Sequence, residues 1–581
     1  MSSHSNSGQR VPPVLDSFAL LLARDSGFAQ RLETVAGVLQ LNAADDSFES
    51  WQALAEQPQP AREFHAALAF LLAVARYPHP EEIRDFTYRW EQSGFIESVQ
   101  AIFASSEYAR LARGATEYRL FVPDADRLFV DISNTLFSSH LSGIQRVVRC
   151  LCHPWVQNNA PVEFFVMRND APRPSLITAD EQHYYLNWTK TFGTASFALG
   201  GLRSRIVPDK ATDGQLTSKQ RLAVRVARRA RVEWHRVLRR SRAMKHTVYG
   251  VLTDIKYYYP GNASPLREKP WVLQVPVFTN HRLLLPELCD LTPRSDFYLT
   301  VKHSMPQTRM SMILYDFIPL WYPEHAGIAH SYLEYLRLLR VADKISCISA
   351  DIERQTRHMV ACIRDRNDPR EIVIATHDLP GSIGSENAPV AADTVEGTAT
   401  RESLPYVLCV GTVESRKNQR TLLHACLNLM KQGTRFRLIF AGNPGWKAQK
   451  FVADLYAAQN QGFEVEIKIS VPEKELIELY RNCAFTVFCS YAEGFGLPIV
   501  ESLRFGKAVV VSDRGCMRDI GDRLGGCYFI EPDRQETIEN AIRLLLSDKS
   551  ELDKLTASIH FEGWPDWNDY ANQLLQFSLK D

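Results

Sequence analysis

The sequence lacks an excess of charge of either sign. Among its 581 residues, Lys and Arg together number 67, and so do Asp and Glu. Proteins that bind nucleic acid usually carry a clear positive excess on the domain that does so. The overall charge therefore does not indicate a nucleic-acid partner, and any basic surface must be confined to one segment.

Long apolar runs are also missing. No stretch of 18 apolar residues occurs, so we expect no transmembrane helix. The opening MSSHSNSGQRVPP has no apolar signal core, and we expect a cytoplasmic location. The 11 cysteines are scattered, mostly among apolar neighbours, and Cys150 and Cys152 lack partners at metal-site spacing. We expect free, buried thiols and no metal site.

The first part of the chain has only helical periodicity. Residues 1–118 carry apolar side chains at helical spacing, so we predict an N-terminal helical module. It ends near Ser106-Glu107-Tyr108, which resembles a helical domain that accompanies bacterial surface-polysaccharide proteins. An unrelated bundle that binds a protein partner remains an alternative.

Two later regions alternate short apolar, β-branched runs with helical stretches. These regions are 125–381 and 405–560, separated by a polar linker at 382–404 and followed by a terminal helix at 561–581. Such alternation predicts parallel sheets with helices on both faces. The predicted strands are 127–133, 162–168, 271–278, 312–320, 344–349, 406–411, 436–442, 465–470, 485–490, 508–512 and 527–532. We predict an α/β fold with two facing Rossmann-like domains and the added helical domain.

The stretch YAEGFGLPIVES at 491–502 places two acids around a glycine turn. Gly494 and Gly496 permit close backbone approach and unusual dihedral angles, and Pro498 fits the first turn of a helix. Helix N-termini favour anions, so a phosphate could lie on this turn. The alternative is an acid-capped turn with no ligand.

The residues EGFGLPIVE resemble the two-glutamate motif of retaining nucleotide-sugar glycosyltransferases of the two-Rossmann-domain (GT-B) type, in family 4 or group 1. The resemblance implies that Glu493 meets the hydroxyls of the transferred sugar and that Glu501 holds a ribose. The substrate-binding residues that it implies on this turn are Gly494, Phe495, Gly496, Leu497 and Glu501.

Residues 409–418, CVGTVESRKN, resemble the phosphate loop of that family. The resemblance implies that Lys417 is the cation on the diphosphate, with Arg416 beside it. Many relatives carry an arginine where this chain has Thr412, and Arg416 is a candidate replacement. Because these cations belong to the protein, the motif requires no metal cofactor. The glycine turn that resembles the family's first helix start would place Gly143 near the phosphates, or Gly143 is only structural.

The segment LYDFIPLWYPEHA at 314–326 resembles a strand end that faces the cleft in the family. Asp316 is therefore the candidate for positioning the acceptor or taking its proton, although it could instead cap its own turn. Relatives often carry histidine where this chain has Tyr315. In CISADIERQT, Ser349 is expected to cap a helix in which Ile352 is the first apolar residue.

The segment 218–245 is strongly basic. Between 219 and 245 there are eleven Lys and Arg and one acid, Glu233, so the local balance is 11 − 1 = +10. A basic amphipathic helix of this kind is typical of binding to an anionic membrane surface. A solvated helix or a nucleic-acid contact are the alternatives, but no motif that reads bases is present.

Taken with the resemblance, these features predict a retaining glycosyltransferase that moves a hexose from a nucleotide diphosphate sugar. The guess for the donor is GDP-mannose, because GTVESRKN is similar to bacterial mannosyl- and rhamnosyltransferases. The expected acceptor is a lipid-linked or growing surface polysaccharide, such as O-antigen, at the inner face of the plasma membrane. The alternatives are a nucleotide-sugar 2-epimerase of the same fold and a non-catalytic scaffold for polysaccharide assembly.

Overall fold

The structure is a computed structural model. It describes residues 28–39, 62–74, 76–103, 117–137, 143–167, 173–177, 181–182, 272–289, 292–322, 326–364, 370–383, 404–445 and 447–580. The chain forms two units, of which the first contains residues 1–177 and 272–581 and the second residues 178–271. The predicted basic helix at 218–245 lies outside the described residues, as do Ser106-Glu107-Tyr108 and the linker from 384 to 403.

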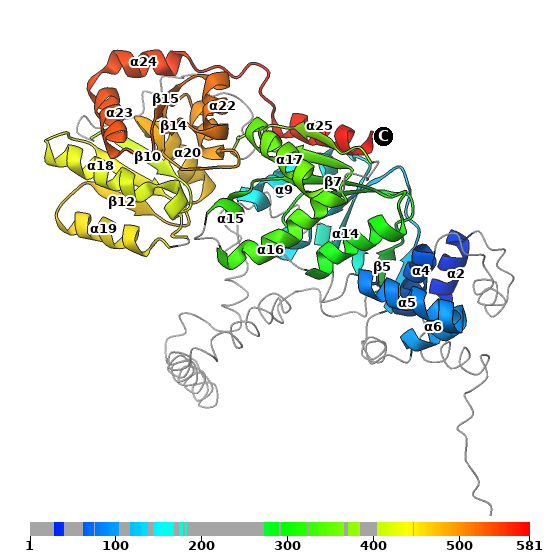
Figure 1. The fold of residues 1–581 in the computed structure, drawn as a ribbon. Helices are drawn as coiled ribbons and strands as arrows, with labels where there is room; N and C mark the ends of the chain where they lie inside the picture. The colour runs from blue at the N-terminus through cyan, green and yellow to red at the C-terminus, as the bar shows by residue number, and fades with distance from the viewer. Residues whose placement is uncertain are drawn as a thin grey trace, which may run out of the picture. The chain divides into compact units, whose positions relative to one another are not determined.

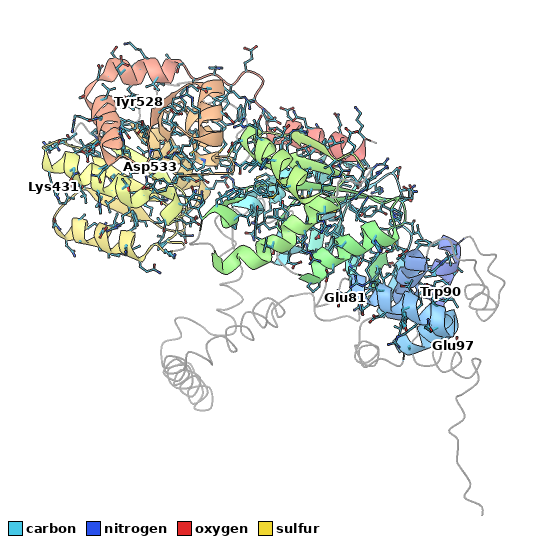
Figure 2. The ribbon with its side chains drawn as sticks, viewed as in Figure 1. Glu81, Trp90, Glu97, Lys431, Tyr528 and Asp533 are labelled. Carbon is cyan, nitrogen blue, oxygen red and sulfur yellow. The ribbon has the colours of Figure 1, made fainter. Side chains whose placement is uncertain are left out.

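Four helices are described in the N-terminal helical module (Figure 1). They are α2 (Phe28–Val38), α4 (Arg62–Val74), α5 (Pro80–Ser93) and α6 (Phe95–Phe103). Trp90, labelled in Figure 2, is buried in this module and packs edge-on against Phe86 and His65. The module is joined to the following domain through Tyr77, whose hydroxyl donates to the Pro276 carbonyl oxygen at 3.1 Å and accepts from the Phe278 amide at 2.8 Å.

The N-terminal α/β domain is built on a seven-stranded sheet in the order β4-β3-β2-β6-β7-β8-β9. Its strands are β2 (Leu128–Asp131), β3 (Val162–Met167), β4 (Pro174–Leu176), β6 (Arg282–Leu285), β7 (Arg309–Leu314), β8 (Lys344–Cys347) and β9 (Val373–Thr376). All neighbouring pairs are parallel except β3 and β4. The described helices of this domain are α8 (Ser133–Phe137), α9 (Gly143–Gln157), α14 (Thr292–Ser304), α15 (Ile318–Trp321), α16 (Ala326–Arg337) and α17 (Ala350–Ile363).

One predicted strand of the first region belongs to a different sheet. Strand β5 (Val272–Pro276), predicted at 271–278, pairs with β1 (Glu117–Phe121) in a separate parallel two-stranded sheet. The place beside β2 is taken by β6, which was not predicted. Its sequence RLLL contains no β-branched or aromatic residue, so the usual compositional sign of a strand is missing.

The C-terminal α/β domain confirms all six strands predicted for it. These are β10 (Tyr406–Val410), β11 (Arg437–Ala441), β12 (Val465–Lys468), β13 (Phe485–Phe488), β14 (Val509–Ser512) and β15 (Cys527–Ile530). The sheet is entirely parallel, in the order β12-β11-β10-β13-β14-β15. Numbered within the domain this order is 3-2-1-4-5-6, which is that of the Rossmann fold.

Helices cover both faces of this sheet, and several are labelled in Figure 1. They are α18 (Gln419–Lys431), α19 (Gln449–Asn460), α20 (Glu473–Asn482), α21 (Leu497–Arg504), α22 (Gly515–Leu524), α23 (Gln535–Ser547) and α24 (Lys549–Ala557). Alternate side chains of β10 enter different cores: Val407 and Cys409 pack with α18, α19 and α23, whereas Leu408 packs with Leu479 and Tyr480 of α20. The predicted doubly covered α/β fold is therefore confirmed.

The C-terminal segment returns to the N-terminal α/β domain. In helix α25 (Trp567–Leu579), the Ala571 carbonyl oxygen accepts from the Trp155 indole at 3.0 Å, and that of Phe577 accepts from Lys344 Nζ at 2.8 Å. The Trp564 indole donates to the Leu379 carbonyl oxygen at 3.2 Å. These bonds attach the end of the chain to the first sheet domain. Within the described ranges, no helix combines the length and apolarity needed to cross a bilayer.

Candidate active site at a topological switch point

The strand order of the C-terminal sheet reverses between β10 and β13. In open parallel sheets, ligands bind outside the carboxyl ends of the strands at such a reversal. The loop after β10 carries Arg416 and Lys417, and the loop after β13 carries Glu493. The fold thus brings three of the predicted site residues to the point of the sheet where a ligand is expected.

Glu493 receives donors on both of its carboxylate oxygens. Arg416 Nη1 lies 2.7 Å from Oε2, and Lys417 Nζ lies 3.1 Å from Oε1. The Ser490 hydroxyl donates to Oε1 at 2.8 Å. Burial raises the pKa of the Glu493 carboxyl, but the two cations outweigh burial and lower this pKa from its ordinary 4.5 to about 2. Glu493 is therefore ionised at neutral pH and fixed in orientation.

Arg416 is the most constrained cation of the site, with a side chain that is only 10% exposed. Its guanidinium also donates to the Ala492 carbonyl oxygen at 2.6 Å and to Glu414 at 3.2 Å. Burial lowers the pKa of Arg416, but the charges of Glu493 and Glu414 raise it above its ordinary value. One donor is left over: the buried Nε has no hydrogen-bond partner among the described residues.

Lys417 is held less tightly. Besides Glu493, its ammonium lies over the Phe488 ring, 5.2 Å from the ring centroid. Its side chain is 14% exposed. Gly411, with φ of +131°, gives this lysine room, because a Cβ there would lie 3.4 Å from Nζ. An ammonium has three donors, so Lys417 can accept an additional anionic ligand.

Thr412, where relatives often carry arginine, belongs to a tightly packed loop pair. The Val413 amide donates to the Asn443 carbonyl oxygen and the Gly445 amide to the Val413 carbonyl oxygen, each at 2.9 Å. A Cβ on Gly445 would come within 2.5 Å of the Thr412 methyl group. It is Arg416, four residues later, that reaches Glu493 in this structure.

The glycine turn after β13 uses its two glycines in different ways. A Cβ on Gly494 would lie 2.2 Å from the Tyr315 carbonyl oxygen, so this glycine permits close approach to the end of β7. Gly496 has φ of +111° and is the N-cap of α21. The predicted close backbone approach at Gly494, the unusual dihedral angle at Gly496 and the place of Pro498 in the first turn of the helix are confirmed.

Phe495 and Leu497 lie on the same turn. The Phe495 side chain is buried and its ring centroid lies 6.3 Å from that of Trp564, so its ring is a packing element. Leu497 is the first residue of α21. For these two residues the polar group that a ligand could meet is the backbone amide.

The turn is tied to the N-terminal α/β domain by Ser349. As predicted, the Ser349 hydroxyl accepts from the Ile352 amide, at 3.2 Å, and so caps α17. The same hydroxyl donates to the Gly494 carbonyl oxygen at 2.8 Å. Ser349 therefore fixes the Gly494 peptide as well as starting a helix.

Glu501 lies one turn into α21 and is 2% exposed. Arg146 Nη1 of α9 is 2.5 Å from its Oε1, and the Tyr480 hydroxyl of α20 donates to its Oε2 at 2.7 Å. Glu501 thus belongs to a polar group of its own rather than to the Glu493 cluster.

Asp316 follows β7 and accepts from the Ile318 amide at 2.9 Å, which is the self-capping contact of the predicted alternative. The charge of Asp316 also raises the pKa of Arg416, by less than the charges of Glu493 and Glu414 do. Tyr315 points elsewhere, because it is buried and its hydroxyl donates to the Pro286 carbonyl oxygen at 2.6 Å.

Gly143 is the exposed first residue of α9, with open space around the position of a Cβ. Among the residues that the structure describes, no group of three or more His, Cys, Asp or Glu is arranged to hold a metal ion. All eleven cysteines are free, as predicted.

Sequence reasoning missed three contributors to the site. Tyr480, Ser490 and the Ser349 contact with Gly494 carry no motif of their own. Only the fold brings Tyr480 to Glu501, Ser490 to Glu493 and Ser349 to the turn. Ser490 had one usable sign: it immediately precedes the turn, three residues before Glu493.

Residues 393–559 match the family model described as glycosyl transferases, group 1. The chain carries a group 1 glycosyltransferase domain. This domain spans β10 to β15, so Arg416, Lys417, Glu493 and Glu501 all lie within it. The resemblance to group 1 glycosyltransferases stated from the sequence is confirmed, and the retaining mechanism stays a prediction.

Curated relatives of this chain include mannosyltransferases. The serotype-specific mannosyltransferase WbdA of Escherichia coli is 26% identical over 216 residues, which make up 36% of this chain and 26% of that protein. The O-antigen chain mannosyltransferase B of Escherichia coli is 32% identical over 146 residues, 25% of this chain and 38% of that protein. The chain thus spans about a quarter of the length of WbdA. The crystal structure of Anabaena HepE in complex with UDP and glucose is similar at 13% identity, with a TM-score of 0.42, over 78% of this chain and 98% of that chain.

Proposed function

We propose that this protein is a retaining glycosyltransferase that moves a hexose from a nucleotide diphosphate sugar to a glycan. The observation that carries the proposal is the cation pair Arg416 and Lys417 at the β10/β13 reversal, held against Glu493 by contacts of 2.7 and 3.1 Å. A diphosphate leaving group develops negative charge as the sugar departs, and fixed cations beside it stabilise that charge most effectively in a partly buried site.

The unpartnered Nε of Arg416 supports a phosphate ligand at this place. A buried donor without an acceptor destabilises the folded protein by about 1–3 kcal/mol. A phosphate oxygen would satisfy this donor and would also accept from Lys417, whose ammonium is partly exposed. The backbone amides of Phe495 to Leu497 at the start of α21 are further donors for an anion. Because these donors belong to the protein, we propose that no metal cofactor is needed.

The glutamates divide the rest of the donor between them in this proposal. Glu493 accepts hydrogen bonds from the hydroxyls of the transferred sugar, and Glu501 accepts them from the ribose. Asp316, across the turn from Gly494, positions the acceptor hydroxyl or takes its proton. No side chain at the site is an evident covalent nucleophile, so the acceptor attacks from the face that the diphosphate leaves.

For the donor and acceptor we propose GDP-mannose and a lipid-linked or growing surface polysaccharide such as O-antigen. The support is that several curated relatives of this chain are mannosyltransferases, some of O-antigen chains. Location at the inner face of the plasma membrane follows from such an acceptor and from the charge of +10 between 219 and 245.

The test is a transfer assay with GDP-mannose and undecaprenyl-diphosphate-linked oligosaccharide, followed by NMR of the product. We expect mannose to appear on the acceptor with the α configuration that it has in the donor. Lys417→Met and Glu493→Gln proteins that remain folded should lose transfer. Transfer by both variants at the wild-type rate would contradict the proposal.

The same assay separates the two alternatives. An epimerase would release free sugar and nucleoside diphosphate from the donor without any acceptor. A scaffold would leave the donor intact under all conditions. Release of nucleoside diphosphate that depends on the acceptor is the result that the proposed function predicts.

A further inference from the structure

Arg146 connects the N-terminal α/β domain to a carboxylate of the glycosyltransferase domain. It lies on α9, and its Nη1 is 2.5 Å from Oε1 of Glu501. Its Nη2 donates to the Ser382 carbonyl oxygen at 2.9 Å. The two contacts use separate nitrogens of one rigid guanidinium, so Glu501 and the end of the N-terminal domain are held in a fixed relation.

Tyr480 supplies the second donor to Glu501. Its hydroxyl donates to Oε2 at 2.7 Å, and its ring stacks on Phe505 with a centroid distance of 5.4 Å and an interplanar angle of 11°. Burial, followed by the charge of Glu501, raises the pKa of the phenol, so the proton stays on Tyr480. Each carboxylate oxygen of Glu501 therefore has one hydrogen-bond donor whose side chain is held in place by a second contact.

These bonds leave acceptor capacity on Glu501. An ionised carboxylate offers about four lone-pair positions, two on each oxygen. Arg146 and Tyr480 occupy one on each oxygen, so each oxygen keeps one. Two neighbouring hydroxyls of a ribose can donate to these two remaining positions. A carboxylate that is already oriented loses less freedom when the ligand binds, which increases affinity.

We propose that Arg146 and Tyr480 are positioning residues for the donor, holding Glu501 oriented to accept the two ribose hydroxyls of a nucleoside diphosphate. The proposal rests on the proposed function, because it requires a nucleotide donor. It adds that ribose recognition depends on a residue of the opposite α/β domain. Ribose binding is thereby coupled to the contact between the two α/β domains.

A second contact between the same domains agrees with this coupling. The Ser349 hydroxyl of α17 donates to the Gly494 carbonyl oxygen at 2.8 Å. The N-terminal α/β domain thus contacts the glycosyltransferase domain at two places. These are the Gly494 turn and the helix α21 that follows it. Separation of the domains would break both contacts together.

The experiment is a double-mutant cycle in which substitutions in the protein are combined with removal of the ribose hydroxyls from the nucleotide. Calorimetry measures GDP, UDP and their 2′,3′-dideoxy analogues on wild type, Arg146→Gln and Tyr480→Phe. Wild type should prefer the ribose form of its nucleotide by roughly tenfold to a hundredfold, as expected for hydrogen bonds to a charged group. Both variants should lose most of that preference while binding the dideoxy form as wild type does.

The matched control is Arg127→Gln. Arg127 forms an ion pair of the same kind in the same domain, at 2.7 Å from Glu163, but both side chains are exposed. This variant should keep the full preference. Arg146→Lys keeps the positive charge but lacks the two-pronged guanidinium. This variant should keep part of the preference for the ribose form.

Three outcomes decide between the ideas. Equal losses for the ribose and dideoxy forms, or an unchanged preference in both variants, would overturn the positioning role and leave the proposed function standing. Absence of binding by wild type to either nucleotide would overturn both. If Arg146→Gln does not fold, Tyr480→Phe decides, because it removes one oxygen atom and leaves the stacked ring.

Discussion

The two large sheets each reverse their strand order once, and the polar side chains at the two reversals differ in how fully they are satisfied. In the N-terminal sheet the reversal lies between β2 and β6, where Arg294 bridges Asp131 and Glu287 at 2.7 Å each. Tyr298 and the Thr135 backbone and hydroxyl complete the network. In the C-terminal sheet the reversal carries Arg416, Lys417 and Glu493.

The N-terminal network is closed. Asp131, Glu287 and Arg294 are all buried, and every buried nitrogen and oxygen of their side chains has a partner. Burial raises the pKa of Glu287 to about 7 despite the opposing charge of Arg294. A network of this kind fixes the loop after β2. The comparison teaches that a reversal of strand order marks a site only where the polar groups remain unsatisfied.

The C-terminal cluster is open in that sense. Arg416 Nε has no described partner, and Lys417 is partly exposed. A ligand can therefore gain hydrogen bonds there that the protein alone does not make. Substitutions should separate the two clusters, because those in the N-terminal cluster should affect folding alone, whereas those in the C-terminal cluster should also affect activity.

The largest effect is expected from Arg294→Met. It leaves two buried carboxyl groups without their cation, which should destabilise the protein by roughly 3–5 kcal/mol. Urea unfolding followed by circular dichroism measures this change. In the exposed pair with Glu163, Arg127→Met should cost about 0–1 kcal/mol. Equal effects of the two substitutions would show that the N-terminal network is not the structural element described here.

Lys417→Met should produce the opposite pattern. Transfer should fall by roughly 100- to 1,000-fold, as when one preorganised electrostatic donor is removed. The free energy of unfolding should fall by less than in Arg294→Met, because Arg416 and Ser490 still hold Glu493. Lys431, labelled in Figure 2, is a matched control, because it also lies over an aromatic ring, that of Phe463 at 5.9 Å. Steady-state kinetics of Lys431→Met should match wild type. Unfolding of Lys417→Met at neutral pH would remove the distinction between the clusters.

Glu493→Gln should change how stability depends on pH. The folded protein lowers the pKa of Glu493 from 4.5 to about 2, so its ionised form stabilises the folded state above pH 4.5. That contribution, about 3 kcal/mol, is lost as the pH falls from 4.5 toward 2. The difference in unfolding free energy between wild type and variant should therefore shrink over this interval. A difference that stays constant from pH 7 to 2.5 would show that the carboxylate is not held by its cations.

Gly143→Ala should have the smallest effect on stability. Apart from its chain neighbours and its own helix backbone, no atom of the described residues lies within 4 Å of the added methyl group, and Gly143 is the first residue of a helix. Alanine should leave the free energy of unfolding unchanged or raise it by up to about 1 kcal/mol. If phosphates pass close to this position, KM for the donor should rise several-fold with a smaller change in kcat. An unchanged KM would remove Gly143 from the donor site.

Much of the glycosyltransferase domain could be predicted because its signals are local. Strands β10 to β15 are short apolar runs between turns, and Gly494, Gly496 and Pro498 announce a strand-to-helix turn by residue type alone. The first sheet domain was harder. Strand β6 has the sequence RLLL, which carries no strand signal. Strand β5 pairs with β1, more than 150 residues earlier in the chain, as the pair Glu117 and Val272 shows.

Contacts between the two α/β domains could not be predicted from the sequence. Arg146 and Glu501 are 355 residues apart, and Ser349 and Gly494 are 145 apart. Neither pair has a spacing that periodicity could reveal, because each depends on how two separately folded sheets meet. The helix cap by Ser349 was predictable for the opposite reason, since it acts on an amide three residues away.

The central claim is that the open cluster at the β10/β13 reversal binds a nucleoside diphosphate. The most direct test is a thermal-shift panel of GDP, UDP, dTDP, ADP and CMP on wild type, Lys417→Met and Lys431→Met. A ligand at 100 times its dissociation constant should stabilise the protein by about 2.7 kcal/mol. We predict a shift with one diphosphate that persists in Lys431→Met and is lost in Lys417→Met. A shift of equal size in all three proteins would place the nucleotide elsewhere and contradict the account.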